Sequence, residues 1–173
     1  LTEGLADIVK IEADATLAPV VDRMVRAGVP VCGHIGSKPQ RAALTGGYAA
    51  AGRTAAEADQ VVADARALQD AGCSMLLLEA VPNETTSRVM AMAKVPVIGI
   101  GAGPSCHGQV LVLQDLLGMT DQSPAFAPAE ANLGAAIQHA GEAWVKRVAE
   151  RGVMPSPYVM RENITSKHTP MKK

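Results

Sequence analysis

Short apolar runs alternate with longer segments of helical periodicity along most of the chain. Runs rich in Val, Ile and Leu predict strands because they end at glycine, proline or a charged residue before a helical pattern begins. The five predicted strands are residues 7–13, 29–36, 73–81, 95–103 and 108–118. The last of these, "GQVLVLQDLLG", is read as a strand rather than a helix because of its β-branched content.

The segments between the strands carry apolar residues at helical spacing. They predict helices over residues 16–28, 54–72 and 83–92, and an amphipathic helix after Pro128. The second helix has the clearest start, because Thr54 and Glu57 have the spacing of a capping box. The polar end, residues 161–173, is expected to be a frayed tail.

Almost wholly apolar strands that alternate with helices predict a parallel sheet in an α/β fold. Two architectures fit this pattern, an open doubly wound sheet and a (β/α)8 barrel. Five strands alone cannot close an eight-stranded barrel, and an open sheet suits the length of 173 residues. The pattern alone leaves both open.

Composition narrows the ligand class. A net charge of −1 and 2% aromatic residues provide neither a basic stripe nor a stacking surface, so we expect a small-molecule ligand and no nucleic acid. The longest apolar run, residues 95–104, is shorter than the roughly 20 residues of a membrane span. Three separated cysteines favour a reducing cytoplasm. The sequence opens at Leu1 without a signal peptide, and we expect it to be part of something longer.

Two opposite charges lie inside the first strand, "DIVKIEA". Lys10 and Glu12 are two residues apart, so in a strand they share one face while Ile11 points to the other. Burying both charges would cost several kcal/mol each, which argues against chance placement. The alternative is a solvated edge strand with a surface ion pair.

Further candidates end the later strands, where parallel α/β folds place catalytic groups. Glu79 follows "MLLL", and its alternative is an acid that caps the next helix. His34 in "VCGHIG" is read as a hydrogen-bonding site residue or a structural histidine, and a zinc site with Cys32 has little support. Asp115 and His107 are weaker candidates, and His107 is expected in a surface loop.

Glycines in "GIGAG" recur at every second position, at Gly99, Gly101 and Gly103. The run is not a dinucleotide fingerprint, because Pro104 stands where that pattern needs glycine. The glycines either clear room for a ligand or allow close backbone packing.

Several of these stretches together resemble the ketopantoate hydroxymethyltransferase family. They are "VKIE", "VPVCGHIG" with "PQ", "GGY" with "GR", "LLLEAVP", "VPVIGIGAG" and "HGQVLVLQD". The resemblance implies a (β/α)8 TIM barrel of the phosphoenolpyruvate/pyruvate type, of which residues 1–155 would form about five of eight βα units and 156–173 a tail. It also implies a cytoplasmic homo-oligomer, a decamer in the family.

The implied reaction transfers a hydroxymethyl group from 5,10-methylenetetrahydrofolate to 3-methyl-2-oxobutanoate, giving ketopantoate for pantothenate and coenzyme A synthesis. By resemblance, Lys10 binds the 2-keto acid, Glu12 faces Mg2+, and Glu79 is the catalytic proton acceptor. His34, as the hydrogen-bonding site histidine, is expected to bind the substrate as well. The shared face of Lys10 and Glu12 then has a reason, because an anionic substrate needs a cation and a hard metal ion needs an oxygen ligand.

The chain departs from the family pattern at several positions: Ala13, Asp14, Ala49, His107 and Gln114. Two aspartates expected upstream of "VKIE" at the metal are not in the sequence, so this chain alone is expected to be inactive. Two other interpretations stay open, a non-catalytic relic or interaction protein and a related 2-keto-acid barrel enzyme.

Overall fold

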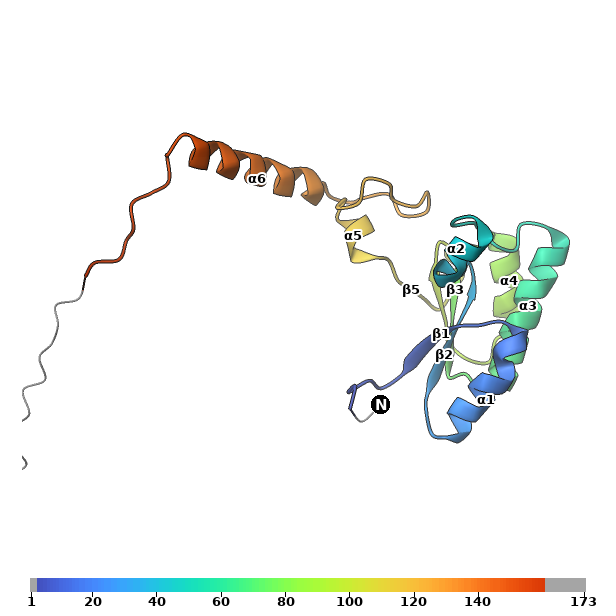
Figure 1. The fold of residues 1–173 in the computed structure, drawn as a ribbon. Helices are drawn as coiled ribbons and strands as arrows, with labels where there is room; N and C mark the ends of the chain where they lie inside the picture. Colours follow the sequence, from blue (N-terminus) through green and yellow to red (C-terminus); the bar gives the residue numbers. More distant parts are fainter. Residues whose placement is uncertain (1–2, 161–173) are drawn as a thin grey trace, which may run out of the picture. The chain divides into compact units, whose positions relative to one another are not determined.

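The computed structural model describes residues 3–160, and in this range five parallel strands form one sheet in the order β1-β2-β3-β4-β5 (Figure 1). The strands are β1 Val9–Glu12, β2 Val31–Gly36, β3 Met75–Glu79, β4 Val97–Ile100 and β5 Gly108–Gln109. Each strand pairs with the next in sequence, without the reversal of order that defines a doubly wound sheet. The predicted parallel α/β fold is confirmed, and its sequential winding is that of a barrel segment.

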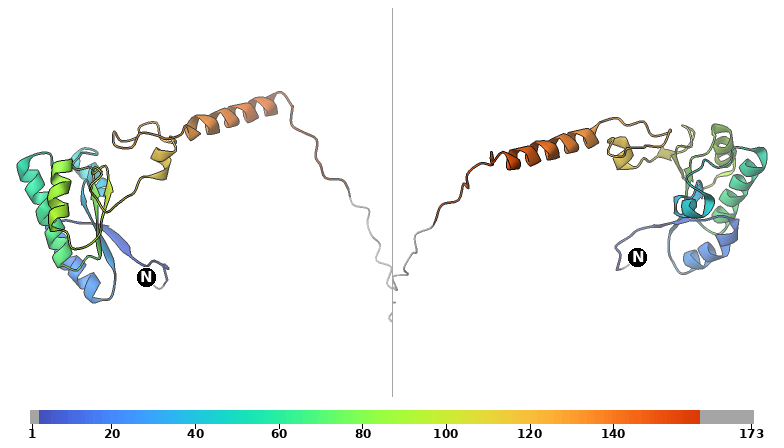
Figure 2. Two further views of the ribbon diagram at one scale, coloured as in Figure 1. Left: turned by 180° about the vertical axis from the view of Figure 1, so that it is seen from behind. Right: turned by 45° about the horizontal axis from the view of Figure 1, so that its top comes forward.

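Three helices cover one face of this sheet: α1 Ala18–Arg26, α3 Ala55–Asp70 and α4 Asn83–Met92 (Figures 1 and 2). Shorter elements lie in the loops that follow the strands: the 3-10 turns η1 Ala15–Leu17 and η2 Pro39–Arg41, and the one-turn helices α2 Ala42–Thr45 and α5 Leu113–Leu116. One-sided cover leaves the opposite face of the sheet without a helix, and that face carries the polar strand residues together with apolar ones such as Leu77 and Ile98.

Helix α3 shows how local sequence sets an element. Thr54 Oγ1 accepts from the backbone N–H of Glu57 at 3.2 Å, and Glu57 Oε2 accepts from Thr54 N–H at 3.2 Å. This capping box satisfies two backbone donors at the start of the helix. Gly72 ends the segment at φ +93°, a conformation that glycine adopts without strain. The predicted helices at α1, α3 and α4 are confirmed.

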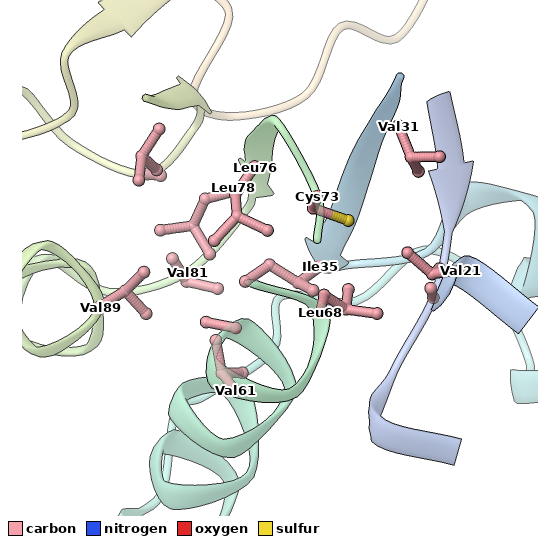
Figure 3. Packing of buried hydrophobic residues seen from close by; sticks show 14 residues of the cluster. Val21, Val31, Ile35, Val61, Leu68, Cys73, Leu76, Leu78, Val81 and Val89 are labelled. Carbon is pink, nitrogen blue, oxygen red and sulfur yellow. The ribbon is translucent and has the colours of Figure 1, made fainter. Parts of the chain in front are cut away.

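The hydrophobic core lies between the sheet and the three helices (Figure 3). Alternate residues of β2 and β3 point into it, and Ile35, Leu76 and Leu78 have no exposed surface. The helices contribute the facing residues Val21, Val61, Ala65, Leu68 and Val89. Burial of this face fixes strand register, because a shift by one residue would expose every core side chain.

The fifth strand differs from its prediction. Residues 108–118 were expected to be one strand, but β5 holds only two residues and α5 begins at Leu113. Among the described residues β5 pairs with β4 alone, and Val110 and Val112 remain exposed. β-branched residues favour a strand only where neighbours pack against them, so composition alone misled the prediction. Asp115 therefore lies in a helix and not at a strand end.

The chain divides into two compact units, Leu1–Asn132 and Leu133–Lys173. In the second unit, α6 Leu133–Ala149 confirms the predicted amphipathic helix, and its apolar residues, including Ile137 and Trp144, are exposed. The division of the chain at residue 155 stays a prediction, and the tail over 161–173 lies outside the described residues. Over residues 3–160, no helix combines the length and apolar character needed to cross a membrane.

Candidate functional site

The candidate residues gather on the face of the sheet opposite the core. Glu12 is in register with His34, and Gly36 is in register with Glu79. Because alternate residues of a strand share a face, Lys10, Glu12, His34 and Glu79 all project from the same side. Three neighbouring strands thus bring together the four residues that the sequence singled out.

His34 connects two of the other candidates. Lys10 Nζ lies 3.3 Å from His34 Nδ1, and His34 Nε2 lies 3.1 Å from Glu79 Oε2. An ammonium group can only donate, so this contact makes Nδ1 the acceptor and puts the ring proton on Nε2, facing the carboxylate. The ring N–H is not aligned with Glu79, so Nε2 has close contact but no directed hydrogen bond. His34 is only 2% exposed, and its Nε2 is a buried donor without an aligned acceptor.

Lys10 and Glu12 have separate partners. Among the described residues Lys10 forms no ion pair with Glu12, so that part of the alternative is wrong. Its other part is confirmed, because β1 is an edge strand of the described sheet and Lys10 is exposed. Both oxygens of Glu12 instead accept from the backbone N–H of Gln40, each at 3.1 Å. Glu12 is 9% exposed, so this single donor from η2 sets the direction of a mostly buried carboxylate.

Asp14 joins the loops that follow β1 and β2. Its Oδ1 accepts from the hydroxyl and backbone N–H of Thr16, and its Oδ2 accepts from Lys38 Nζ at 2.9 Å and Arg41 Nη1 at 3.1 Å. The Thr16 hydrogen bond, followed by that of Lys38, lowers the pKa of Asp14 from 3.8 to about 2. Asp14 is therefore ionised at neutral pH, and its acceptor positions are all occupied by these four donors.

Glu79 stands at a sharp change of chain direction. Its carbonyl accepts from Ser37 N–H at 2.8 Å, and Gly36 at φ +88° leaves the space for that contact. The next residue, Ala80, has φ +48°, which costs a residue with a side chain about 1–2 kcal/mol. Strain of this kind persists where the surroundings over-determine it, and such positions cluster at functional sites. Glu79 does not cap α4, whose N-cap is Pro82.

A cavity of about 700 Å³ opens beside Glu79. Its walls include Ile100, Phe126 and the buried Asp115, whose Oδ1 accepts from Thr120 Oγ1 at 2.8 Å. The volume lies within the range of small-molecule sites, which combine apolar walls with few polar groups. Asp115 is thus near the site, although from a helix rather than a strand.

The glycine run fits both of its readings. A side chain at Gly101 would meet the ring of Phe126 and one at Gly103 would meet Asn83, so close packing requires both glycines. Gly101 and Gly103 also line a cavity of about 720 Å³, so room for a ligand stays open as well. His107 is exposed as predicted, and its Nδ1 accepts from Val97 N–H at 3.0 Å.

A zinc site at Cys32 gains no support. Burial raises the pKa of the Cys32 thiol, against the opposing effect of Lys10, and burial raises that of Cys73 to about 11. A thiol must lose its proton to bind zinc. Within residues 3–160 no three His, Cys, Asp or Glu side chains are grouped so that they could hold a metal ion.

The described residues also provide too few free oxygen ligands for Mg2+. Mg2+ prefers near-octahedral coordination by oxygen. Glu12 offers one carboxylate, and Asp14 has its oxygens committed to four donors. The described residues alone do not make a magnesium site.

Sequence reasoning missed two contributors to the site. Gln40 acts through its backbone N–H, for which the type of side chain gives no signal. Asp14 stood out only as a departure from the family pattern, because its two cationic partners, Lys38 and Arg41, lie more than 20 residues away. The non-local pairing of Lys10 with His34 was likewise not predicted.

Comparisons with protein families and with curated proteins both lead to one family. The family described as Ketopantoate hydroxymethyltransferase matches residues 1–156. Three curated relatives carry the name 3-methyl-2-oxobutanoate hydroxymethyltransferase. The protein of Halorhodospira halophila is 45% identical over 91% of this chain and 57% of its own length. Those of Anaeromyxobacter sp. strain K and Pyrobaculum neutrophilum are 48% and 41% identical, over 87% and 94% of this chain and 50% and 62% of their own lengths. The chain thus spans between half and about three-fifths of these relatives.

Proposed function

Because the chain belongs to the ketopantoate hydroxymethyltransferase family, we propose that it carries part of an active site that transfers a hydroxymethyl group to 3-methyl-2-oxobutanoate. The observation that supports this most is the row Lys10, His34 and Glu79, with Glu12 beside it on the same face. The row combines a cation, a ring donor and a carboxylate on three neighbouring strands.

The proposed reaction begins with the loss of a proton from C3 of the keto acid. Glu79 takes this proton, since it is a carboxylate at the cavity and has no capping role. The resulting enolate carries negative charge, which Lys10 stabilises, and the His34 Nε2–H donates to a substrate oxygen. The enolate carbon then forms a bond to the one-carbon unit, which we propose comes from 5,10-methylenetetrahydrofolate. Both C–N bonds of that methylene carbon break, one water supplies the hydroxyl group, and tetrahydrofolate leaves with its two nitrogens protonated, by the C3 proton and a proton of the water.

In this proposal Mg2+ is bound jointly by this chain and by further polypeptide. Glu12 would hold it from this chain, and the other oxygen ligands would come from polypeptide beyond these 173 residues, consistent with the longer relatives. When bound, such an ion polarises a keto oxygen. A cytoplasmic homo-oligomer that serves pantothenate and coenzyme A synthesis is the proposed setting.

The test is deuterium exchange at C3 of 3-methyl-2-oxobutanoate, followed by proton NMR in the native polypeptide that carries this chain. Glu79→Gln should slow Mg2+-dependent exchange at least 100-fold, since general-base catalysis contributes about 10²–10⁴. Glu84→Gln, at an exposed acid of α4, is the matched control. Exchange that survives in Glu79→Gln would remove Glu79 as the base. Wild-type polypeptide that shows neither exchange nor transfer would favour a non-catalytic role.

Lys10→Ala tests substrate recognition separately. It should raise KM for the keto acid about tenfold or more while KM for the folate changes little, since Lys10 contacts only the anionic substrate in this proposal. Lys94→Ala is the control for loss of a lysine outside the site. An equal rise in both KM values would contradict the role of Lys10.

A further inference from the structure

Asp14 has an unusually full set of donors for a residue just outside a strand. Both of its oxygens are engaged, one by Thr16 and the other by Lys38 and Arg41, at 2.9 and 3.1 Å for the two cations. Its side chain is only 17% exposed. A carboxylate with four donors has no position left for a metal ion or a substrate, so its role has to be indirect.

The two cations come from either end of one turn. Lys38 precedes η2 and Arg41 is its last residue, so Asp14 holds the turn at both ends. Gln40 lies between them, and its N–H is the donor to both oxygens of Glu12. Asp14 is thus connected to Glu12 through the turn that carries this N–H.

We infer that Asp14 is a positioning residue, which fixes η2 so that the Gln40 N–H holds the Glu12 carboxylate in one orientation. The inference about geometry needs no catalysis, but the use of that orientation in the reaction rests on the proposed function. Asp14 is one of the positions at which the chain departs from the family pattern.

Asp14→Asn is a near-isosteric test. An asparagine oxygen can still accept from Thr16 N–H, but it lacks the charge that holds Lys38 and Arg41. The matched control is Asp22→Asn, which removes an exposed acid paired with Arg26 at 2.8 Å, away from η2. The probe is the Gln40 amide, observed in the 173-residue chain with 15N-labelled glutamine at constant pH.

The reference position for a broken contact comes from Glu12→Gln, which removes the charged acceptor. In Asp14→Asn we expect the Gln40 amide proton to shift most of the way towards its Glu12→Gln position and to exchange with solvent at least fivefold faster. Amides in α3 should keep their exchange rates, and Asp22→Asn should leave Gln40 unchanged.

Two results would overturn the inference. One is a Gln40 amide that keeps its wild-type shift and exchange rate in Asp14→Asn. The other is faster exchange throughout α3 as well, which would make Asp14 a general stabilising residue. Either result can occur whether or not Glu79→Gln blocks C3 exchange, so failure here is distinct from failure of the proposed function.

Discussion

Replacing Gly36 by alanine probes the junction that holds Glu79. Gly36 has φ +88°, and an added Cβ would lie against the Glu79 carbonyl oxygen, well inside normal contact, and 3.0 Å from Val81 Cγ1. The left-handed conformation costs alanine about 1–2 kcal/mol. Relief of the backbone clash adds about 1–3 kcal/mol, and loss of the Ser37 N–H bond to Glu79 adds about 1 kcal/mol. The free energy of unfolding should therefore fall by about 3–6 kcal/mol.

Gly28→Ala isolates the conformational part of that loss. Gly28 has φ +83°, but nothing lies within 4 Å of an added Cβ, so only the conformational cost of about 1–2 kcal/mol remains. Urea unfolding should be followed by far-UV circular dichroism, because Trp144 lies in α6, outside the unit that contains the sheet. Equal destabilisation by the two substitutions would refute the argument that the Glu79 carbonyl requires glycine at position 36.

Three further changes test other parts of the account. Thr54→Ala removes the N-cap of α3 and should lower the urea midpoint by the equivalent of about 1 kcal/mol; an unchanged midpoint would mean that the capping box contributes nothing. Leu78→Ala empties a fully buried core position and should cost about 2–5 kcal/mol in the same assay, whereas a loss below 1 kcal/mol would show that the core collapses around it. Asp14→Asn should cost about 1 kcal/mol at pH 6, after allowance for solvent screening of a pKa shift worth more than twice that. Because the folded pKa of Asp14 is lowered to about 2, this stabilisation is present above about pH 4 and disappears as the pH falls towards 2. A wild-type advantage that persists at pH 2 would contradict this assignment.

The sequence predicted correctly those elements whose stabilising contacts join residues close together in the chain. The capping box at Thr54 and Glu57 is complete within four residues, so the start of α3 could be predicted from the sequence. The fifth strand could not, because the pairing and packing available to Val110 and Val112 depend on distant parts of the chain.

In the candidate site, too, features set by neighbouring residues could be predicted and features set by distant residues could not. Strand periodicity predicted that Lys10 and Glu12 share a face. Their partners, His34 and Gln40, depend on the register between β1 and β2 and on the loop after β2, which a single sequence does not specify. A backbone donor such as Gln40 N–H is a property of loop conformation and has no signature in side-chain type.

The most direct test of the proposed function is C3 deuterium exchange of 3-methyl-2-oxobutanoate with Mg2+, comparing wild-type native polypeptide with Glu79→Gln. The account predicts exchange in the wild type and a loss of at least 100-fold in the variant, with Glu84→Gln like the wild type. Wild-type exchange that persists undiminished in Glu79→Gln would contradict the assignment of Glu79 as the base.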